Sequence, residues 1–196
     1  GELSDSDVDW IIENSYLDPE AFLKIATVTT TVNEQKKFLK KFKDYYLNLF
    51  ELSEDIEYTT YVSDAIQKII LPHGEIMNNA SATLKQLRKD INHVRGKSSE
   101  SFSKALSSSI NNGYLDDIKE TIIDNQRVLA VIAMHRRKVK GSLLGSSKSG
   151  NIVYIAPQAT LAYSRELQNL LYEEKQEIVK ILRTLADEIR PFTPLL

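Results

Sequence analysis

The sequence predicts a mainly α-helical chain in which two long antiparallel helices carry a small antiparallel β insertion at their tip. Apolar residues recur at three- and four-residue spacing in two stretches of similar length, which is typical of amphipathic helices. The segment between them consists of short strand-like runs separated by turn residues. With 196 residues, 42% hydrophobic and 27% charged, the chain has room for one or two ordinary folded domains.

The first part of the chain is predicted to be helical. Asp18-Pro19-Glu20 has the features of a helix start: a capping Asp, Pro at the first helical position and an acid in the first turn. The β-branched run Thr27 to Val32 is expected to interrupt this helix or to split it. A further helix is expected from about Asp55 to Ile70. Leu71-Pro72-His73-Gly74 then breaks the chain.

Two apolar stripes define the long helices. The first consists of Leu84, Leu87, Ile91, Val94, Phe102 and Leu106, and the second of Leu167, Leu171, Ile178, Leu182, Leu185 and Ile189. Each stripe needs a partner, so the two helices are expected to lie side by side and antiparallel. Leu87 and Leu171 are then predicted to lie in the seam between them.

The segment between the long helices is predicted to be a small antiparallel sheet within about residues 120–157. Arg127 to Met134 and Asn151 to Ala156 are rich in strand-forming residues. The run "KVKGSLLGS" is expected to pair with the second of these across the turn "SSKSGN", where Gly150 can adopt a positive φ.

This β segment is strongly basic on a chain whose net charge is −2. No acidic residue occurs between Asp124 and Glu166, whereas seven basic residues do: Arg127, Arg136, Arg137, Lys138, Lys140, Lys148 and Arg165. One interpretation is a solvated loop that collected basic residues by chance. The other is a phosphate-binding surface, because a basic patch is the electrostatic footprint of nucleic-acid binding.

The candidate nucleic-acid-binding residues are Arg127, Arg136, Arg137, Lys138, Lys140 and Lys148. Only Tyr154 and Tyr163 lie near them as aromatic residues, so the composition favours contact with the phosphate backbone over base reading or stacking.

No catalytic residue, metal site or cofactor site is predicted in the chain. The run "GSSKSG" lacks the P-loop pattern, because Ser147 stands before Lys148 where glycine is required and a strand follows instead of a helix. His73, His93 and His135 are far apart in sequence and have no cysteine partners. No serine lies in a Gly-x-Ser-x-Gly elbow.

The cellular setting is predicted from what the composition lacks. The chain has no cysteine, which excludes disulfides and fits a reducing cytoplasmic location. No apolar run approaches the roughly 20 residues of a membrane helix, and no signal-peptide pattern is present at the start. Because the chain begins with Gly1 rather than Met, we expect it to be a piece of a longer protein.

The run "TIIDNQRVLAVIAMHRRKVKGSLLGSSKSGNIVYIAPQAT", followed by "ELQNLLYEEKQEIVKILRTL", resembles the MutS family of DNA mismatch-repair ATPases. It is more similar to the second MutS branch, whose members act against homologous recombination or on stalled ribosomes. "GEIMNNASATLKQLRKDI" resembles the helix opening of that branch. The matching positions are Arg127; Arg137 with Val139 and Gly141; Ser147 with Ser149 and Gly150; and Ile155 with Pro157. The chain departs from the branch at Ala156, where Glu is usual, and at Gln126, where an Asn-Gly-Arg run is favoured.

The resemblance implies a domain organisation. Residues 1–75 would be part of the helical core, 76–112 an ascending lever helix, 113–158 a small β-rich, clamp-like tip and 159–196 a descending lever helix. The ATPase domain, with its ATP and Mg²⁺, would follow the lever in the parent protein, which is expected to be a homodimer through that domain. The segment itself would not be an enzyme, and it could be a monomer.

Two functions are open at this point. The first is a non-catalytic module that touches duplex or branched DNA, or structured RNA, through its basic tip. The second is a mechanical module that contacts protein or the ribosome and makes no direct contact with DNA.

Overall fold

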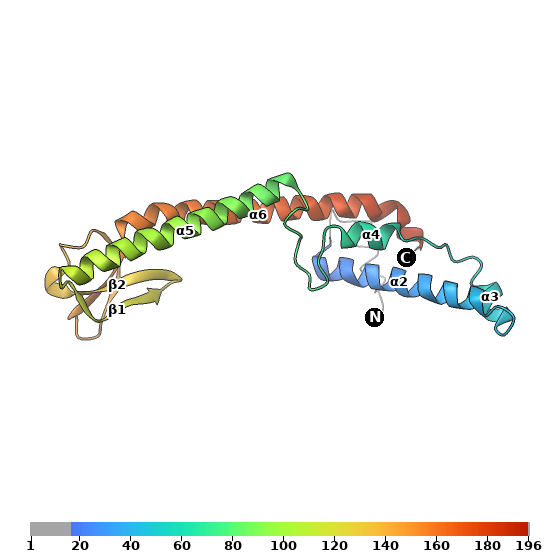
Figure 1. Cartoon of the computed structure of the whole chain (residues 1–196), viewed down its shortest axis with the longest axis horizontal. Helices are drawn as coiled ribbons and strands as arrows, with labels where there is room; N and C mark the ends of the chain where they lie inside the picture. The colour runs from blue at the N-terminus through green and yellow to red at the C-terminus, as the bar shows by residue number, and fades with distance from the viewer. Residues whose placement is uncertain (1–16, 196) are drawn as a thin grey trace. The chain divides into compact units, whose positions relative to one another are not determined.

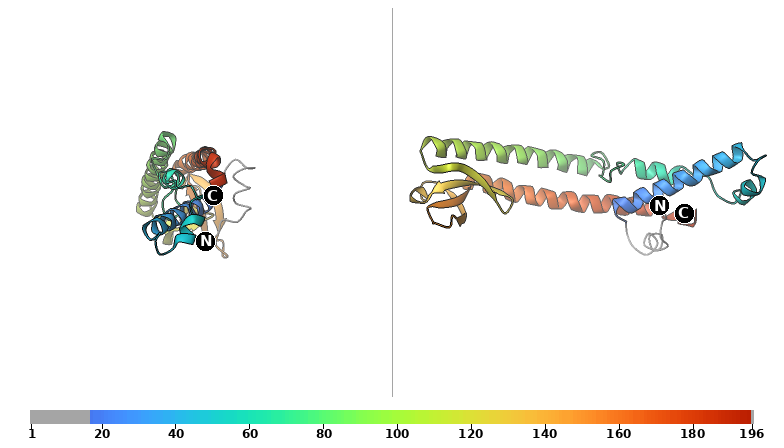
Figure 2. Two further views of the ribbon diagram at one scale, coloured as in Figure 1. Left: turned by 90° about the vertical axis from the view of Figure 1, so that its right-hand side faces the viewer. Right: turned by 90° about the horizontal axis from the view of Figure 1, so that it is seen from below.

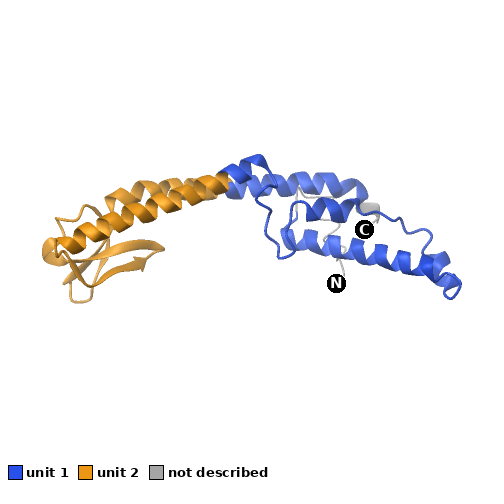
Figure 3. Cartoon of the chain, viewed as in Figure 1, with its two compact units in different colours: residues 1–86, 174–196 blue, residues 87–173 orange. Residues whose placement is uncertain are grey.

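The computed structural model describes residues 17–195. The chain divides into two compact units (Figure 3): the first takes its described residues from 1–86 and 174–196, and the second is formed by residues 87–173. The helices α5 (Ala82–Asn111) and α6 (Gln158–Ile189) each contribute to both units. The described chain is mainly helical with one small antiparallel sheet, as predicted.

The first unit begins with helix α2 (Pro19–Lys41), which starts where the sequence predicts (Figure 1). The Asp18 carboxylate accepts a hydrogen bond of 2.8 Å from the Ala21 backbone N–H, and this satisfies one of the four unpaired donors of the first turn. Glu20 adds negative charge at the positive end of the helix dipole.

The predicted interruption of α2 at its β-branched run is wrong, because the helix is continuous through it. The hydroxyl groups of Thr27, Thr29, Thr30 and Thr31 donate to the carbonyl oxygens four residues earlier, at 2.8–2.9 Å. Each threonine therefore satisfies its own polar group within the helix, which removes the main reason for a break.

The helix predicted for about residues 55–70 is shorter than expected. The structure has α3 (Leu47–Leu52) and then α4 (Tyr61–Gln67). The side-chain amide of Asn33 donates to the Thr59 carbonyl oxygen and accepts from the Thr59 backbone N–H. This pair of bonds ties the chain to α2, so the backbone at Thr59 makes a tertiary contact instead of a helical one.

The predicted break at residues 71–74 is confirmed. The Gly74 N–H donates to the Leu71 carbonyl oxygen at 2.9 Å, and Gly74 has a φ of 90°, which only glycine adopts without strain. Ile70 and Ile76 then pair in a short antiparallel bridge across the turn.

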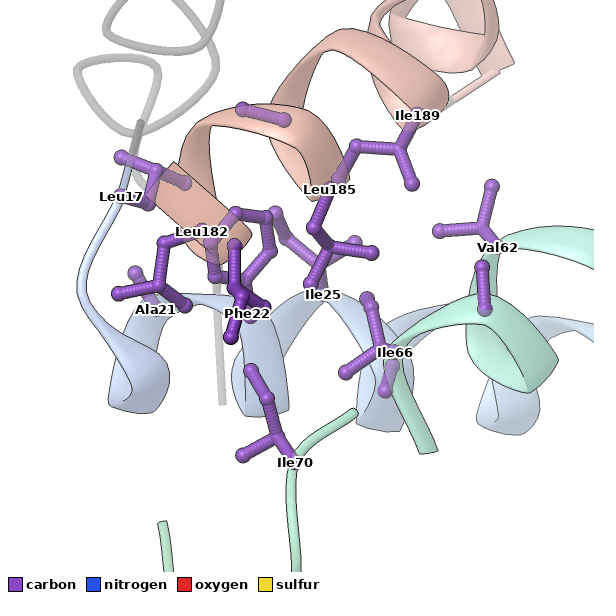
Figure 4. Close-up of a cluster of buried hydrophobic side chains, with 14 of the residues drawn as sticks. Leu17, Ala21, Phe22, Ile25, Val62, Ile66, Ile70, Leu182, Leu185 and Ile189 are labelled. Carbon is purple, nitrogen blue, oxygen red and sulfur yellow. The ribbon is translucent and has the colours of Figure 1, made fainter. Parts of the chain in front are cut away.

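The core of the first unit is formed by α2, α4, the start of α5 and the end of α6 (Figure 4). Its fully buried side chains include Phe22 and Ile25 from α2, Ile66 from α4 and Leu185 and Ile189 from α6. The Ser81 hydroxyl connects α5 and α6 in the same unit. It accepts from the Leu84 N–H and donates to the Glu177 carboxylate at 2.7 Å.

The apolar stripe predicted on the second long helix is buried only in its C-terminal half. Leu182, Leu185 and Ile189 are 3% exposed or less, whereas Leu171 is 38% exposed. The prediction that Leu171 lies in a buried seam with Leu87 is therefore wrong, although Leu87 itself is buried.

The second unit holds four strands: β1 (Leu115–Ile123), β2 (Gln126–Ile132), β3 (Gly141–Ser146) and β4 (Ile152–Pro157). Their order in the sheet is β1-β2-β4-β3, and all neighbouring strands are antiparallel. The C-terminal part of α5 lies along this sheet in Figure 1 and in the right panel of Figure 2. The prediction confined strands to about residues 120–157, but β1 begins earlier, at Leu115.

The face of the sheet toward α5 carries the core of the second unit. Phe102 of α5 packs there with Leu115, Leu129, Val131, Val153 and Ile155. On the opposite face the sheet curls over itself, since a Cβ built on Gly145 of β3 would lie 3.9 Å from Cδ1 of Ile123 on β1, the other edge strand. Val128, which faces away from α5 between the neighbouring positions of β2, is also completely buried.

Candidate nucleic-acid interface

The six basic residues singled out by the sequence lie on three segments of the second unit. Arg136, Arg137, Lys138 and Lys140 belong to the connection between β2 and β3, Lys148 to the β3–β4 turn and Arg127 to β2. All six side chains are exposed. The sheet has two ends. We call the end at which β2 finishes the distal end, and the end that holds the β1–β2 turn the hairpin end.

The β2–β3 connection travels the length of the sheet. β2 and β3 both pair antiparallel with β4, so they run in the same direction with β4 between them. The connection must therefore return from the distal end to the hairpin end. Hydrogen bonds fix both of its ends: the Ala133 N–H donates to the Asn151 carbonyl at 2.8 Å, and the Gln158 N–H donates to the Lys140 carbonyl at 3.0 Å.

Apolar contacts hold the connection against the sheet between those ends. Val139 packs against the buried core of the second unit. The His135 ring lies 5.1 Å from the Tyr114 ring, centroid to centroid. With these two side chains turned inward, Arg136, Arg137 and Lys138 remain exposed to solvent.

The β3–β4 turn places Lys148 at the distal end. Ser147 organises the turn, because its carbonyl accepts from the Gly150 N–H at 2.9 Å and its hydroxyl accepts from the Ile152 N–H at 3.2 Å. Gly150 has a φ of 74°, as the turn composition predicts. Since Asn151 is bonded to Ala133, this turn and the start of the basic connection lie together.

Gly141 sets how the basic connection enters β3. A Cβ at this position would overlap the carbonyl oxygen of Ala156 on β4, so the two backbones approach closely only because residue 141 is glycine. The carbonyl of the preceding residue, Lys140, is bonded to the first residue of α6. Gly141 also matches a position of the family pattern, and the close approach of β4 gives that glycine a physical role.

Arg127 is separated from Lys148 and from the start of the β2–β3 connection, which lie at the distal end. It pairs across the strands with Ile122 near the hairpin end, five residues from Ile132, which corresponds to about 17 Å along the strand. Its Nη2 donates to both Glu120 carboxylate oxygens, at 2.7 and 3.1 Å. Its guanidinium lies over the Phe102 ring, 4.1 Å from the centroid. Arg127 thus binds β1 and α5 of its own unit.

Strand β1 brings acidic residues into the sheet. Asp116, Asp117 and Glu120 lie on β1, and Asp124 follows in the β1–β2 turn, just before the acid-free stretch of the sequence. Because β1 and β3 are the two edge strands, these acids lie on the opposite edge from Lys148 and the start of β3. Pairing of β1 with β2 also places Glu120 beside Arg127. This ion pair was not predicted from the sequence.

The described residues were also compared with the requirements of a metal site and of a membrane-spanning helix. Within residues 17–195 the structure shows no group of three or more His, Asp or Glu side chains that could hold a metal ion. Among the helices of this described part, none is both long enough and apolar enough to cross a membrane.

Comparison with known proteins gives one consistent relationship. No family model matches the chain. It is 30% identical over 174 residues to Endonuclease MutS2 of Pelotomaculum thermopropionicum, covering 89% of this chain and 22% of that protein. It is 28% identical over 182 residues to Putative endonuclease MutS2 of Bacillus subtilis, and 26% identical over 182 residues to Endonuclease MutS2 of Finegoldia magna; both alignments cover 91% of this chain and 23% of the relative.

The chain therefore spans about a fifth of the length of the curated relatives it matches. The aligned part nevertheless extends over about nine-tenths of the chain, well beyond the segment whose residues resemble the family. These similarities support the MutS2 branch of the MutS family for this chain.

Proposed function

We propose that this chain is a segment of a MutS2-type protein and that it contacts the phosphate backbone of nucleic acid through a basic surface. The basic surface consists of Arg136, Arg137, Lys138, Lys140 and Lys148. The observation that carries the proposal is that none of these five cations forms an ion pair with any described residue. They remain available to displace the counterions of a nucleic acid.

Arg127 is left out of the basic surface because of its partners. Glu120 neutralises its charge, and Phe102 fixes the plane of its guanidinium. This ion pair sets Arg127 apart from the five residues of the basic surface, which have none with a described residue.

The proposed contact is with the backbone and is not sequence-specific. The basic surface offers cations on one turn and one connection, whereas base reading uses side chains that a helix or β ribbon carries into a groove. We expect weak, largely sequence-independent binding by the isolated chain, with a dissociation constant in the range of about 10⁻⁴ to 10⁻⁶ M.

Catalysis, including ATP hydrolysis, is proposed to belong to other parts of the parent protein. The "GSSKSG" run forms the turn between the paired strands β3 and β4, and no helix follows it, so it lacks the geometry of a phosphate-binding loop. ATPase activity with its ATP and Mg²⁺, the endonuclease activity in the relatives' names and homodimerisation would then lie outside this segment.

The test is a salt titration of duplex DNA binding, repeated with a structured RNA. If three or four phosphates are contacted, log K should fall with log salt at a slope of about −3 to −4, at ~0.9 per phosphate. Replacing Arg136, Arg137 and Lys138 together by Ala should flatten this slope. The matched control replaces the exposed Lys40, Lys41 and Lys43 of the first unit by Ala, which removes the same charge elsewhere.

A second candidate function is a protein- or ribosome-interaction module of the same parent without direct DNA contact. It is favoured by exposed apolar side chains near α3, among them Tyr45 (84% exposed) and Leu52 (76% exposed). Equal loss of affinity and of salt slope in the two triple variants, or no loss in either, would reject the basic surface and leave this candidate.

A further inference from the structure

A polar hollow of about 260 Å³ lies within the second unit, separate from the basic surface. Its walls come from α5, from the first turns of α6 and from the start of β2 with the preceding β1–β2 turn. Two arginines, Arg95 and Arg127, line it. No carboxylate does, so the charge of the lining itself is positive.

Most guanidinium donors of the two arginines are uncommitted. An arginine carries five N–H donors. Arg127 uses the donors of Nη2 for Glu120, and its Nε and Nη1 bond to no described residue. Arg95 has no described hydrogen bond or ion pair at all.

Neutral donors add to this set from two sides. The hydroxyl groups of Ser98 and Ser99 on α5 and the side-chain amides of Asn125 and Gln126 line the hollow, and none is bonded to another described side chain. By contrast, Thr160 and Ser164 of α6 donate their hydroxyl protons to backbone carbonyls of α6 and of Pro157. The free donors are thus concentrated on the α5 and hairpin walls.

Arg127 is preorganised for an anion. Glu120 and Phe102 hold its guanidinium in one plane, so a ligand does not have to order this side chain. Phe102 and Leu167 give the hollow an apolar part, which strengthens a charge-assisted hydrogen bond beside it. The pair of planar forks matches the oxygens of a tetrahedral anion better than isolated ammonium groups would.

We propose that this hollow binds a phosphate group, held by Arg95 and Arg127 and by hydroxyl and amide donors from α5 and the β1–β2 turn. The phosphate could be a free anion or nucleotide, or a phosphodiester of a nucleic acid. The inference does not depend on the basic surface, because its first measurement uses inorganic phosphate alone.

The experiment follows amide and arginine Nε–H signals of the ¹⁵N-labelled chain by NMR. Inorganic phosphate is added at constant ionic strength, with chloride as the reference salt. The signals of Ser98, Gln126 and Arg127 should shift and saturate. Arg95→Gln should weaken the fitted affinity about ten-fold or more, since it removes charge-assisted bonds. Arg136→Gln, a matched change on the basic surface, should leave the affinity within about two-fold of the parent.

A second variant guards against indirect effects. Ser98→Asp introduces a carboxylate at a partly buried position that lines the hollow, and it should abolish the saturable shifts while the circular dichroism of the chain is retained. Absence of saturable shifts in the parent chain would overturn the proposal. So would equal phosphate affinity in the parent, Arg95→Gln and Ser98→Asp.

Titration with a nucleoside monophosphate and with a short DNA duplex then separates the sources of the phosphate. Shifts of the same signals by the duplex, weakened by Arg95→Gln, indicate a backbone phosphate, whereas shifts by the monophosphate alone indicate a free ligand. If the triple Ala variant of the basic surface binds duplex as the parent does while the hollow still binds phosphate, the proposed function fails and this inference stands.

Discussion

The guanidinium of Arg127 on β2 lies over the ring of Phe102 on α5, 4.1 Å from its centroid. Through the salt bridge to Glu120, the same side chain also joins β1 to this contact. One basic residue therefore connects two strands and a helix of the second unit, and it contributes to packing as well as to charge.

We expect Arg127→Ala to destabilise the chain by about 1–2 kcal/mol. The change removes a cation–π contact and a half-exposed salt bridge, and each of these is a modest contribution. Arg127→Lys should recover little of the loss, because an ammonium lacks the planar fork. Urea unfolding monitored by circular dichroism measures both variants. A stability equal to that of the parent would show that the contact contributes nothing.

Two leucines of α6 provide a matched test of the core. Leu185 is fully buried and Leu171 is 38% exposed. Leu185→Ala should cost about 2–5 kcal/mol, and Leu171→Ala under about 1 kcal/mol, because only the first leaves a cavity. Similar losses in both variants by denaturant unfolding would mean that Leu171 is covered in solution.

Alanine substitutions at two glycines should change the stability of the chain in opposite directions. Gly141→Ala forces a methyl group against the Ala156 backbone and should destabilise the chain by about 1–3 kcal/mol. Gly96 lies inside α5 with open space around its Cα, so Gly96→Ala should stabilise by up to about 1 kcal/mol. Thermal unfolding of the two variants gives the signs, and a stabilising Gly141→Ala would contradict the close approach of β3 and β4.

The phenol of Tyr61 should lose its proton at a higher pH than an ordinary tyrosine does. Its hydroxyl donates to the Glu188 carboxylate at 2.8 Å, and this hydrogen bond, followed by burial and by the charge of Glu188, raises the pKa of Tyr61 above its ordinary value of 10.0. The folded state therefore retains the proton more tightly than the unfolded chain does. The resulting stabilisation is complete below the unfolded pKa and is lost as the pH rises through the folded pKa.

The measurement is an NMR titration of ¹³C-labelled tyrosine in the parent and in Glu188→Gln. The variant should lower the pKa of Tyr61, because the amide keeps a hydrogen-bond acceptor but removes the negative charge and its stronger bond. An unchanged titration of Tyr61 in Glu188→Gln would rule out the contact between α4 and α6.

Local signals explain why much of the fold could be predicted. The cap at Asp18, the turn glycines at 74 and 150 and the strand-forming runs of β2 and β4 each act over a few residues, and each is where the sequence places it. Strand β1 was missed in part because its polar run "LDDIKETII" lacks a clear strand pattern. Its turn also uses Asp124 and Asn125 at positive φ, without the glycine that usually marks such a hairpin.

The parts that could not be predicted depend on contacts between distant segments. Helix α4 begins only at Tyr61, because the backbone of Thr59 is bound by the side chain of Asn33, which is 26 residues away. The separation of Arg127 from Lys148 likewise follows from strand register, and its partner Glu120 comes from the strand that was missed. Charge counting along the sequence treats six cations as one patch, whereas the sheet distributes them over two ends.

The return path of the β2–β3 connection has a consequence for binding stoichiometry. The connection returns along the length of β4, a strand of six residues, so the cations of the basic surface extend over about 20 Å. With a rise of about 3.4 Å per base pair, that length corresponds to about six base pairs of duplex. Each copy of the chain should then occlude roughly half a helical turn, so a 24-base-pair duplex should saturate at about four copies, and not at one.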